Sequence, residues 1–117
     1  MDTDPTLIAD FLKELKKLIS TGRDFVFVGR HENNSAFTNL GLTWHNFITE
    51  LLELSVVNYC SGPEPDRDRS GFVWVFGKEI NGHQVYIKLK IFDVGPERKA
   101  KCISFHEAEH PINFPYK

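Results

Sequence analysis

The sequence has few cysteines, no long apolar run and little net charge. Its two cysteines, Cys60 and Cys102, belong to no CxxC pair, so we expect both to remain thiols in a reducing compartment. No apolar stretch approaches the roughly 20 residues that span a bilayer, and residues 1–5 are acidic where a signal peptide would be basic. A net charge of −2 argues against a protein that coats nucleic acid. These absences predict a cytoplasmic protein with no membrane partner.

The composition is typical of one folded domain. The chain is 41% hydrophobic, 26% charged and 13% aromatic, and 117 residues can bury a core without disulfides or metals. The charge is uneven, because residues 1–70 carry 7 basic and 11 acidic side chains whereas residues 71–117 carry 7 and 5. We therefore expect any site for a polyanion to lie in the second part of the chain.

The first part of the chain has helical periodicity. Asp4 and Pro5 are typical of an N-cap and a first helical residue, Gly22 is typical of a helix end, and Thr43 is typical of a second N-cap. The predicted elements here are a helix over 5–21, a strand over 24–29, a polar loop over 30–34, a short helix over 35–39 and a helix from 43 to 54.

From residue 56 the period changes to two, which predicts strands. Asn81-Gly82 is a strong hairpin signal, and residues 61–71 are so rich in proline and charge that we expect them not to pair. The predicted strands cover 56–60, 72–79, 84–92 and 101–105, with a turn at 95–97. The fold class is therefore α+β, with N-terminal helices packed on one face of an antiparallel β-sheet meander. A single domain over 1–106 and an irregular C-terminal tail over 107–117 complete the prediction.

Alternation along the two last strands separates a core face from an open face. Val85, Ile87 and Leu89 form the apolar row of the longer strand. If the strands form a simple meander, Ile103 and Phe105 join this core row. The opposite face, which no predicted helix covers, then carries Tyr86, Lys88, Lys90, Cys102, Ser104 and His106.

A phenol, an imidazole and several ammonium groups on one open face suit metal-independent RNA cleavage. Histidine can move protons near neutral pH, lysine can stabilise the charge on phosphorus, and tyrosine can bind a phosphate or stack on a base. The same alternation is also typical of a solvated sheet face without a catalytic role, and the pattern by itself favours that second interpretation.

The pentad HEAEH at 106–110 matches the HExxH signature of zinc metalloproteases. That signature needs a helix that places both histidines on one face, with a third ligand further along the chain. Here the pentad follows a predicted strand and meets Pro111, and no residue after His110 can bind zinc. A zinc hydrolase acting through His106, Glu107 and His110 is therefore the third and least favoured alternative.

The loop sequence DRDR at 66–69 admits two interpretations. Arg67 and Arg69 could clamp RNA phosphates. However, an aspartate precedes each arginine, which favours a solvated loop whose charges compensate one another. Trp74 and Phe76 alternate on one strand, which favours core packing over stacking on bases.

Short motifs in a consistent order resemble those of a known family. The segments are KLISTG at 17–22, LGL at 40–42, QVYIK at 84–88 and SF at 104–105. In this order and spacing the chain resembles the MqsR family, toxins of type II toxin–antitoxin modules within the RelE-like group of bacterial mRNA interferases.

The resemblance implies a RelE-like fold that cleaves mRNA, free or on the ribosome, without a metal or other cofactor. It also implies a cognate antitoxin as partner. The family's catalytic tyrosine falls on Tyr86, and its last-strand lysine falls on His106. Two further catalytic positions fall near Cys60 and Val75, where the family has a lysine and a glutamine.

The sequence therefore predicts an endoribonuclease with Tyr86, His106 and Lys88 as catalytic residues. Because two family positions differ, other cations must supply positive charge, and the RNA-binding candidates are Lys78, Lys90, Arg67 and Arg69. The alternative is a non-enzymatic protein-binding adaptor of the same fold, for which the acidic first part of the chain is no disadvantage.

Overall fold

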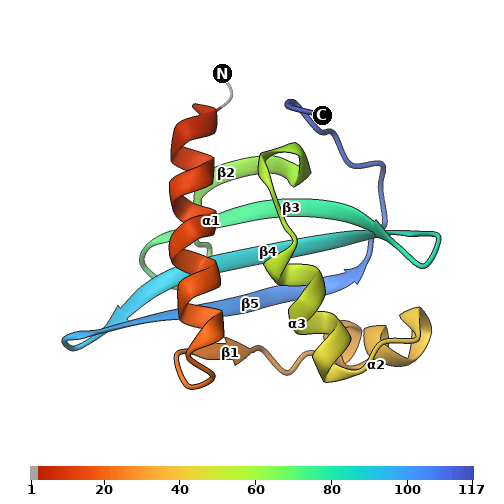
Figure 1. The fold of residues 1–117 in the computed structure, drawn as a ribbon, viewed down its shortest axis with the longest axis horizontal. Coiled ribbons are helices and arrows are strands. Elements are labelled where there is room, and N and C mark those ends of the chain that lie inside the picture. Colours follow the sequence, from red (N-terminus) through yellow and green to blue (C-terminus); the bar gives the residue numbers. More distant parts are fainter. Residues whose placement is uncertain (1–2) are drawn as a thin grey trace.

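The computed structural model describes residues 3–117 and confirms the α+β class, with helices that precede most of the sheet (Figure 1). The sheet has five strands in the order β1-β5-β4-β3-β2. The elements are α1 (Pro5–Ser20), β1 (Phe25–Phe27), α2 (His31–Leu40), α3 (Trp44–Leu52), the 3-10 turn η1 (Val56–Asn58), β2 (Tyr59–Pro65), β3 (Phe72–Ile80), β4 (His83–Val94) and β5 (Glu97–Glu107).

Helix α1 begins and packs as its sequence predicts. The Asp4 carboxylate accepts a hydrogen bond from the Thr6 backbone N–H at 2.7 Å, and Pro5 is the first helical residue. The apolar side of the helix is buried against the sheet, where the Phe11 ring stacks on Trp74 with 4.5 Å between centroids. Trp74 therefore packs against the core, as the alternation of its strand predicted.

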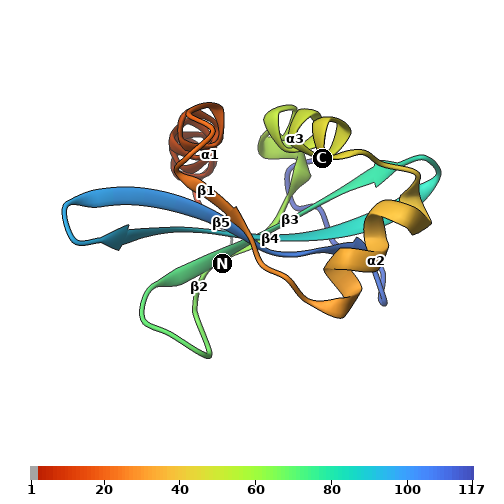
Figure 2. The same ribbon diagram turned by 90° about the horizontal axis from the view of Figure 1, so that it is seen from below.

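Helix α3 lies on the same face of the sheet as α1 (Figure 2). Thr43 forms a capping box with Asn46, which fixes the start of the helix as predicted. The fully buried Phe47 ring then meets Phe105 of β5 edge to face at 4.7 Å. The core thus fills the layer between these two helices and the sheet.

Four elements differ from the sequence prediction. Val56–Asn58, predicted as the start of a strand, form the 3-10 turn η1, and β2 begins only at Tyr59. Helix α2 begins at His31 instead of 35. Strand β2 extends to Pro65, although prolines were expected to prevent pairing; β2 is an edge strand, where a residue without an N–H can point outward. Strand β1 pairs parallel to β5, so the sheet is mixed while β2 to β5 form the predicted meander. The Asn81-Gly82 turn is confirmed, with φ of 50° and 83°.

A β-bulge in β5 changes which side chains face the core. Lys88 pairs with Ser104 and Leu89 pairs with Cys102, so Ile103 is the extra residue. An extra residue reverses the alternation, and Cys102 is therefore buried in the core cluster at 0% exposure. The prediction that Cys102 faces away from the core and that Ile103 belongs to it was wrong.

Asn33 of α2 holds the bulged part of β5 in place. Its side-chain amide donates to the carbonyl oxygens of Val28 and Ile103 at 2.9 and 2.8 Å, and its oxygen accepts from the Phe105 N–H at 2.9 Å. Strand β1 is too short to pair with this part of β5, so Asn33 supplies the hydrogen bonds that a neighbouring strand would supply.

Candidate functional site

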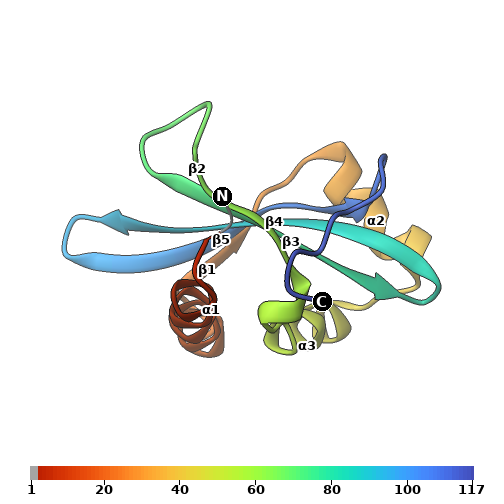
Figure 3. The same ribbon diagram turned by 90° about the horizontal axis from the view of Figure 1, so that it is seen from above.

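The candidate site lies on the open face, which we define as the face of the sheet away from α1 and α3. Figure 3 shows the β2–β3 connection on this side, and the C-terminal tail begins here before it crosses toward the helices. The tail reaches over Gly77, since a Cβ built at that glycine would lie 2.6 Å from Cδ1 of Ile112. The face is therefore partly covered by these two segments.

Tyr86 of β4 and His106 of β5 are direct partners across the two strands. Their rings stack with 5.5 Å between centroids and an angle of 27° between planes, and the Lys88 ammonium lies 6.0 Å from the centre of the Tyr86 ring. Burial, and to a lesser extent the nearby Glu64 carboxylate, raise the pKa of Tyr86 above its ordinary value. At neutral pH Tyr86 is consequently a phenol that can donate a hydrogen bond.

One hydrogen bond determines which nitrogen of His106 can accept a proton. Nδ1 lies 2.9 Å from the carbonyl oxygen of Glu107. Because a carbonyl oxygen only accepts, Nδ1 must carry the proton and donate it. In the neutral imidazole Nε2 is then the nitrogen with a free lone pair, which is the form that a general base needs.

Two hollows share Tyr86 as a lining residue. The first has a volume of about 410 Å³ and is lined by His106, Cys60 and the tail segment 108–112. The second has a volume of about 420 Å³ and combines basic, acidic and apolar side chains. Besides Tyr86 its lining residues are Arg30, Glu64, Pro65, Asp66, Arg67, Asp68, Val73, Lys88 and Ile103.

Two of the predicted RNA-binding lysines are already held by carboxylates. Lys78, which was predicted to bind RNA, lies on the helix-covered face, where its ammonium meets Glu50 of α3 at 2.8 Å. Lys90 is only 2% exposed, and its ammonium contacts the Asp66 carboxylate at 2.7 Å and the Ser70 carbonyl at 2.6 Å. Lys90 anchors the β2–β3 loop and contributes no free charge.

Five other cations line hollows of the open face without an ion pair to any described residue. Arg67 and Lys88 line the second hollow beside Tyr86. Arg69 and Lys101 line a third hollow of about 250 Å³, and Arg30 lines both. Because Asp66 pairs with Lys90, the expectation that each aspartate of the loop compensates the arginine after it fails at this position.

Sequence reasoning missed Arg30 and Lys101. Lys101 is the cross-strand partner of Lys90, a pairing that the bulge in β5 shifted out of the simple register. Arg30 reaches the open face only because β1 runs beside β5, and no local pattern in the sequence signals a parallel pair. Of the two residues where the resemblance predicted a lysine and a glutamine, Cys60 lines the first hollow with His106, and Val75 is buried opposite Lys88.

The HExxH pentad belongs to two structural units, as its context predicted. His106 and Glu107 end β5, whereas residues 108–110 are irregular and not helical. Across residues 3–117 no three or more histidine, cysteine, aspartate or glutamate side chains gather so that they could hold a metal ion. Within the same residues no helix is both long and apolar enough to cross a membrane.

No protein-family model, curated protein or solved structure matches the chain.

Proposed function

We propose that the protein is a metal-independent endoribonuclease whose cleavage site is the group formed by His106, Tyr86 and Lys88. The observation that carries the proposal is the stacking of Tyr86 on His106 at 5.5 Å, next to the Lys88 ammonium. RNA cleavage through the 2′-hydroxyl needs a proton acceptor, a hydrogen-bond donor and a cation. These three side chains supply one of each.

The reaction begins at Nε2 of neutral His106, which accepts the proton of a 2′-hydroxyl. The 2′-oxygen forms a bond to the adjacent phosphorus, and the bond from phosphorus to the 5′-oxygen breaks. The protonated imidazole returns the proton to the departing 5′-oxygen, which leaves a 2′,3′-cyclic phosphate and a 5′-hydroxyl. Lys88 and the Tyr86 phenol stabilise the negative charge on the pentavalent phosphorus.

Local charge supports the proposal in spite of the net charge of −2. The second and third hollows hold five cations and two carboxylates, Glu64 and Asp68, that make no ion pair among the described residues, whereas Asp66 is already neutralised by Lys90, so an excess of three positive charges remains there. A phosphodiester strand gains from such a concentration of positive charge, because each contacted phosphate releases a counterion. The net charge of −2 therefore does not describe the open face, where positive side chains are in excess.

Cleavage of a fluorogenic RNA in excess EDTA tests the proposal. We expect His106→Ala to lower the rate about 10²- to 10⁴-fold, as general acid–base groups contribute that much. Tyr86→Phe removes one hydrogen bond to a charged group and should lower the rate about tenfold or more. His45→Ala is the matched control, because His45 is exposed on α3, on the other side of the sheet.

Two results would refute the assignment: no cleavage by the wild type, or equal rates for the wild type and the His106→Ala variant. A strand with 2′-O-methyl groups must stay intact, because the mechanism needs the 2′-hydroxyl. Cleavage of that strand would show that another chemistry, or a contaminating nuclease, is responsible.

The proposal extends to a cellular role as the toxin of a toxin–antitoxin module, neutralised by a cognate antitoxin. The resemblance of the segments at 17–22, 40–42, 84–88 and 104–105 to the MqsR family supports this role. Induction in a bacterial host should stop growth and create new mRNA 5′ ends, and His106→Ala should abolish both effects. Growth arrest without new ends would instead favour a protein-binding adaptor.

A further inference from the structure

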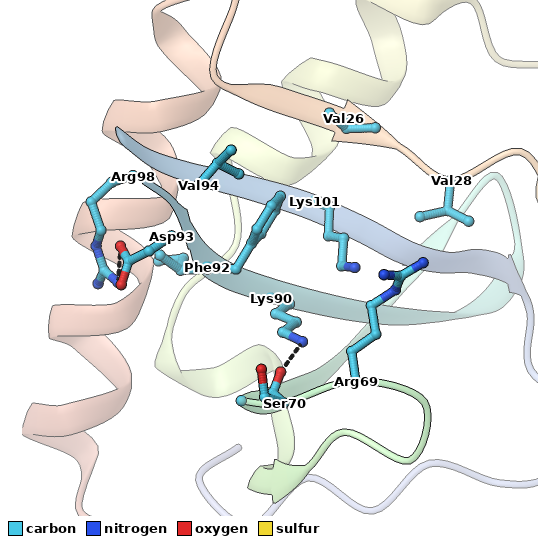
Figure 4. Close-up of a pocket in the computed structure, with 12 residues that line it drawn as sticks. Val26, Val28, Arg69, Ser70, Lys90, Phe92, Asp93, Val94, Arg98 and Lys101 are labelled. Atoms are coloured by element: carbon cyan, nitrogen blue, oxygen red, sulfur yellow. Dashed lines mark hydrogen bonds and ion pairs between the residues drawn. The ribbon is translucent and has the colours of Figure 1, made fainter. Parts of the chain in front are cut away.

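A further hollow lies between β1, the turn end of the β4–β5 hairpin and residues 69–71. We call it the β1 hollow; its volume is about 740 Å³. Figure 4 shows the Lys101 and Arg69 side chains pointing toward one another, with Val26 above them and Phe92 and Val94 to their left. Neither the cleavage site nor the core accounts for this combination of two cations and an apolar wall.

Of the four cations that line the β1 hollow, two are paired with carboxylates and two make no ion pair among the described residues. Arg98 and Asp93 pair with each other at 3.3 Å, and Lys90 is held by the β2–β3 loop. Lys101 and Arg69 make no ion pair among residues 3–117. Partial burial, together with repulsion from neighbouring cations that include Lys90 and Arg69, lowers the pKa of Lys101. An anion bound between Lys101 and Arg69 would relieve this repulsion.

The apolar wall of the β1 hollow is suited to a base. Val26 of β1 and Val94 of β4 are 48% and 49% exposed, and both line this hollow. The Phe92 ring is half-buried, and the Lys101 ammonium lies 5.1 Å from its centre. A cation next to apolar and aromatic surface is the arrangement that single-stranded nucleic acid uses for phosphate and base together.

The β1 hollow is connected to the cleavage site by shared lining residues. Arg69 and Lys101 also line the third hollow, and Arg30 and Ile103 line both the third hollow and the second one beside Tyr86. Lys90, the cross-strand partner of Lys101, lies four residues along β4 from Tyr86, which corresponds to about 13 Å. An RNA strand that contacts both Tyr86 and Lys101 must therefore contain more than one phosphate.

We propose that the β1 hollow binds a second stretch of the same single-stranded RNA, with Arg69 and Lys101 on its phosphates and the apolar wall against a base. This inference rests on the proposed ribonuclease function and names the substrate class as a single strand of several nucleotides. It predicts that the protein prefers a strand long enough to reach from Tyr86 to Lys101 over a dinucleotide.

The test measures binding and cleavage separately. Binding is measured by fluorescence anisotropy with a labelled single-stranded DNA of about ten nucleotides, which has no 2′-hydroxyl and stays intact. Removal of two phosphate contacts by the double substitution Arg69→Gln and Lys101→Gln should make the slope of log K against log salt less steep by about 1.4. The dissociation constant should rise at least about tenfold.

The control removes the same charge elsewhere. Lys13 and Lys17 are exposed on α1, on the other side of the sheet, and their double substitution by glutamine should leave the slope within error of the wild type. An Arg69/Lys101 variant that binds the strand as the wild type does would overturn the inference. So would a control variant that loses as much affinity, because net charge alone would then explain the binding.

Cleavage distinguishes this inference from the proposed function. Wild-type KM should be lower for a ten-nucleotide RNA than for a mixture of dinucleoside monophosphates, and the Arg69/Lys101 variant should lose that preference. Cleavage without any preference for length would overturn the proposed role of the β1 hollow in RNA binding, but it would leave the assignment of Tyr86 and His106 to the cleavage site unchanged. If the protein binds the strand through Arg69 and Lys101 but cleaves no RNA, the β1 hollow is supported as a nucleic-acid-binding site and the proposed ribonuclease activity is overturned.

Discussion

The buried ion pair between Lys90 and Asp66 allows a quantitative test of how the open face is built. The side chains of Lys90 and Asp66 are only 3% and 10% exposed, and their charged atoms lie 2.7 Å apart. Asp66→Asn would remove the negative charge and keep the size of the side chain. The Lys90 ammonium would then stay buried with neutral acceptors alone, the Ser70 carbonyl and the new amide oxygen at position 66, and no carboxylate to balance its charge.

A buried charge that loses its partner costs about 3–5 kcal/mol. We expect the lower value of about 3 kcal/mol, because the Ser70 carbonyl still accepts a hydrogen bond from the ammonium. At roughly 4 °C per kcal/mol for a chain of this size, the melting temperature should fall by about 12 °C. Calorimetry and urea unfolding at pH 7 would measure both quantities. Asp68→Asn is the matched control, since Asp68 is exposed in the same loop, and it should stay within about 0.5 kcal/mol of the wild type.

The pH dependence of the same difference is an internal check. The hydrogen bond from Lys90 holds the pKa of Asp66 at about 2 instead of its usual 3.8. A carboxylate whose pKa is lowered in the folded state stabilises that state above its unfolded pKa, and the contribution is lost as the pH falls. The difference between the wild type and Asp66→Asn should therefore shrink between about pH 4 and pH 2. An Asp66→Asn variant within about 0.5 kcal/mol of the wild type at pH 7 would refute the reasoning.

Two further predictions concern groups that the fold buries. Asn33→Ala should lower the free energy of unfolding by at least about 2 kcal/mol, because it leaves polar groups of β5 without partners. Asn34→Ala, at an exposed neighbouring position, should change the free energy of unfolding little. Equal effects of the two substitutions in urea titrations would contradict the role of Asn33. Burial raises the pKa of Cys102 far above its ordinary value, and that of the half-buried Cys60 less. Iodoacetamide at pH 8 should therefore modify Cys60 alone in the native protein and both cysteines in denaturant, as mass spectrometry would detect; native modification of Cys102 would contradict its burial.

Local patterns were enough to predict most of the elements. Asp4 and Thr43 cap helices where their side chains can accept from nearby backbone N–H groups, and Asn81-Gly82 forms the turn that its backbone freedom favours. Each of these features depends on residues within a few positions of one another. Alternation also placed Tyr86 and His106 on one face correctly, because the β4–β5 register is regular from Val85 to Lys88.

The parts that could not be predicted depend on contacts between distant residues. The prolines of β2 were expected to prevent pairing, and only its place at the edge of the sheet makes them tolerable. Lys78 shares the face of Trp74 and Phe76 by alternation, and what stabilises its charge there is Glu50, 28 residues away in the chain. The pattern of a strand specifies which residues share a face, but it does not specify what lies over that face.

The sequence by itself determined the α+β class, the helix caps, the hairpin and the alternation that sets Tyr86 and His106 apart from the core rows of their strands, since these follow from short-range sterics and periodicity. Tertiary structure alone decided the bulge at Ile103, the burial of Lys90 and the approach of Arg30 and Lys101. The physical reason is that a bulge or a buried charge is stable only when a remote group satisfies it, as Asn33 does for Phe105 at a separation of 72 residues.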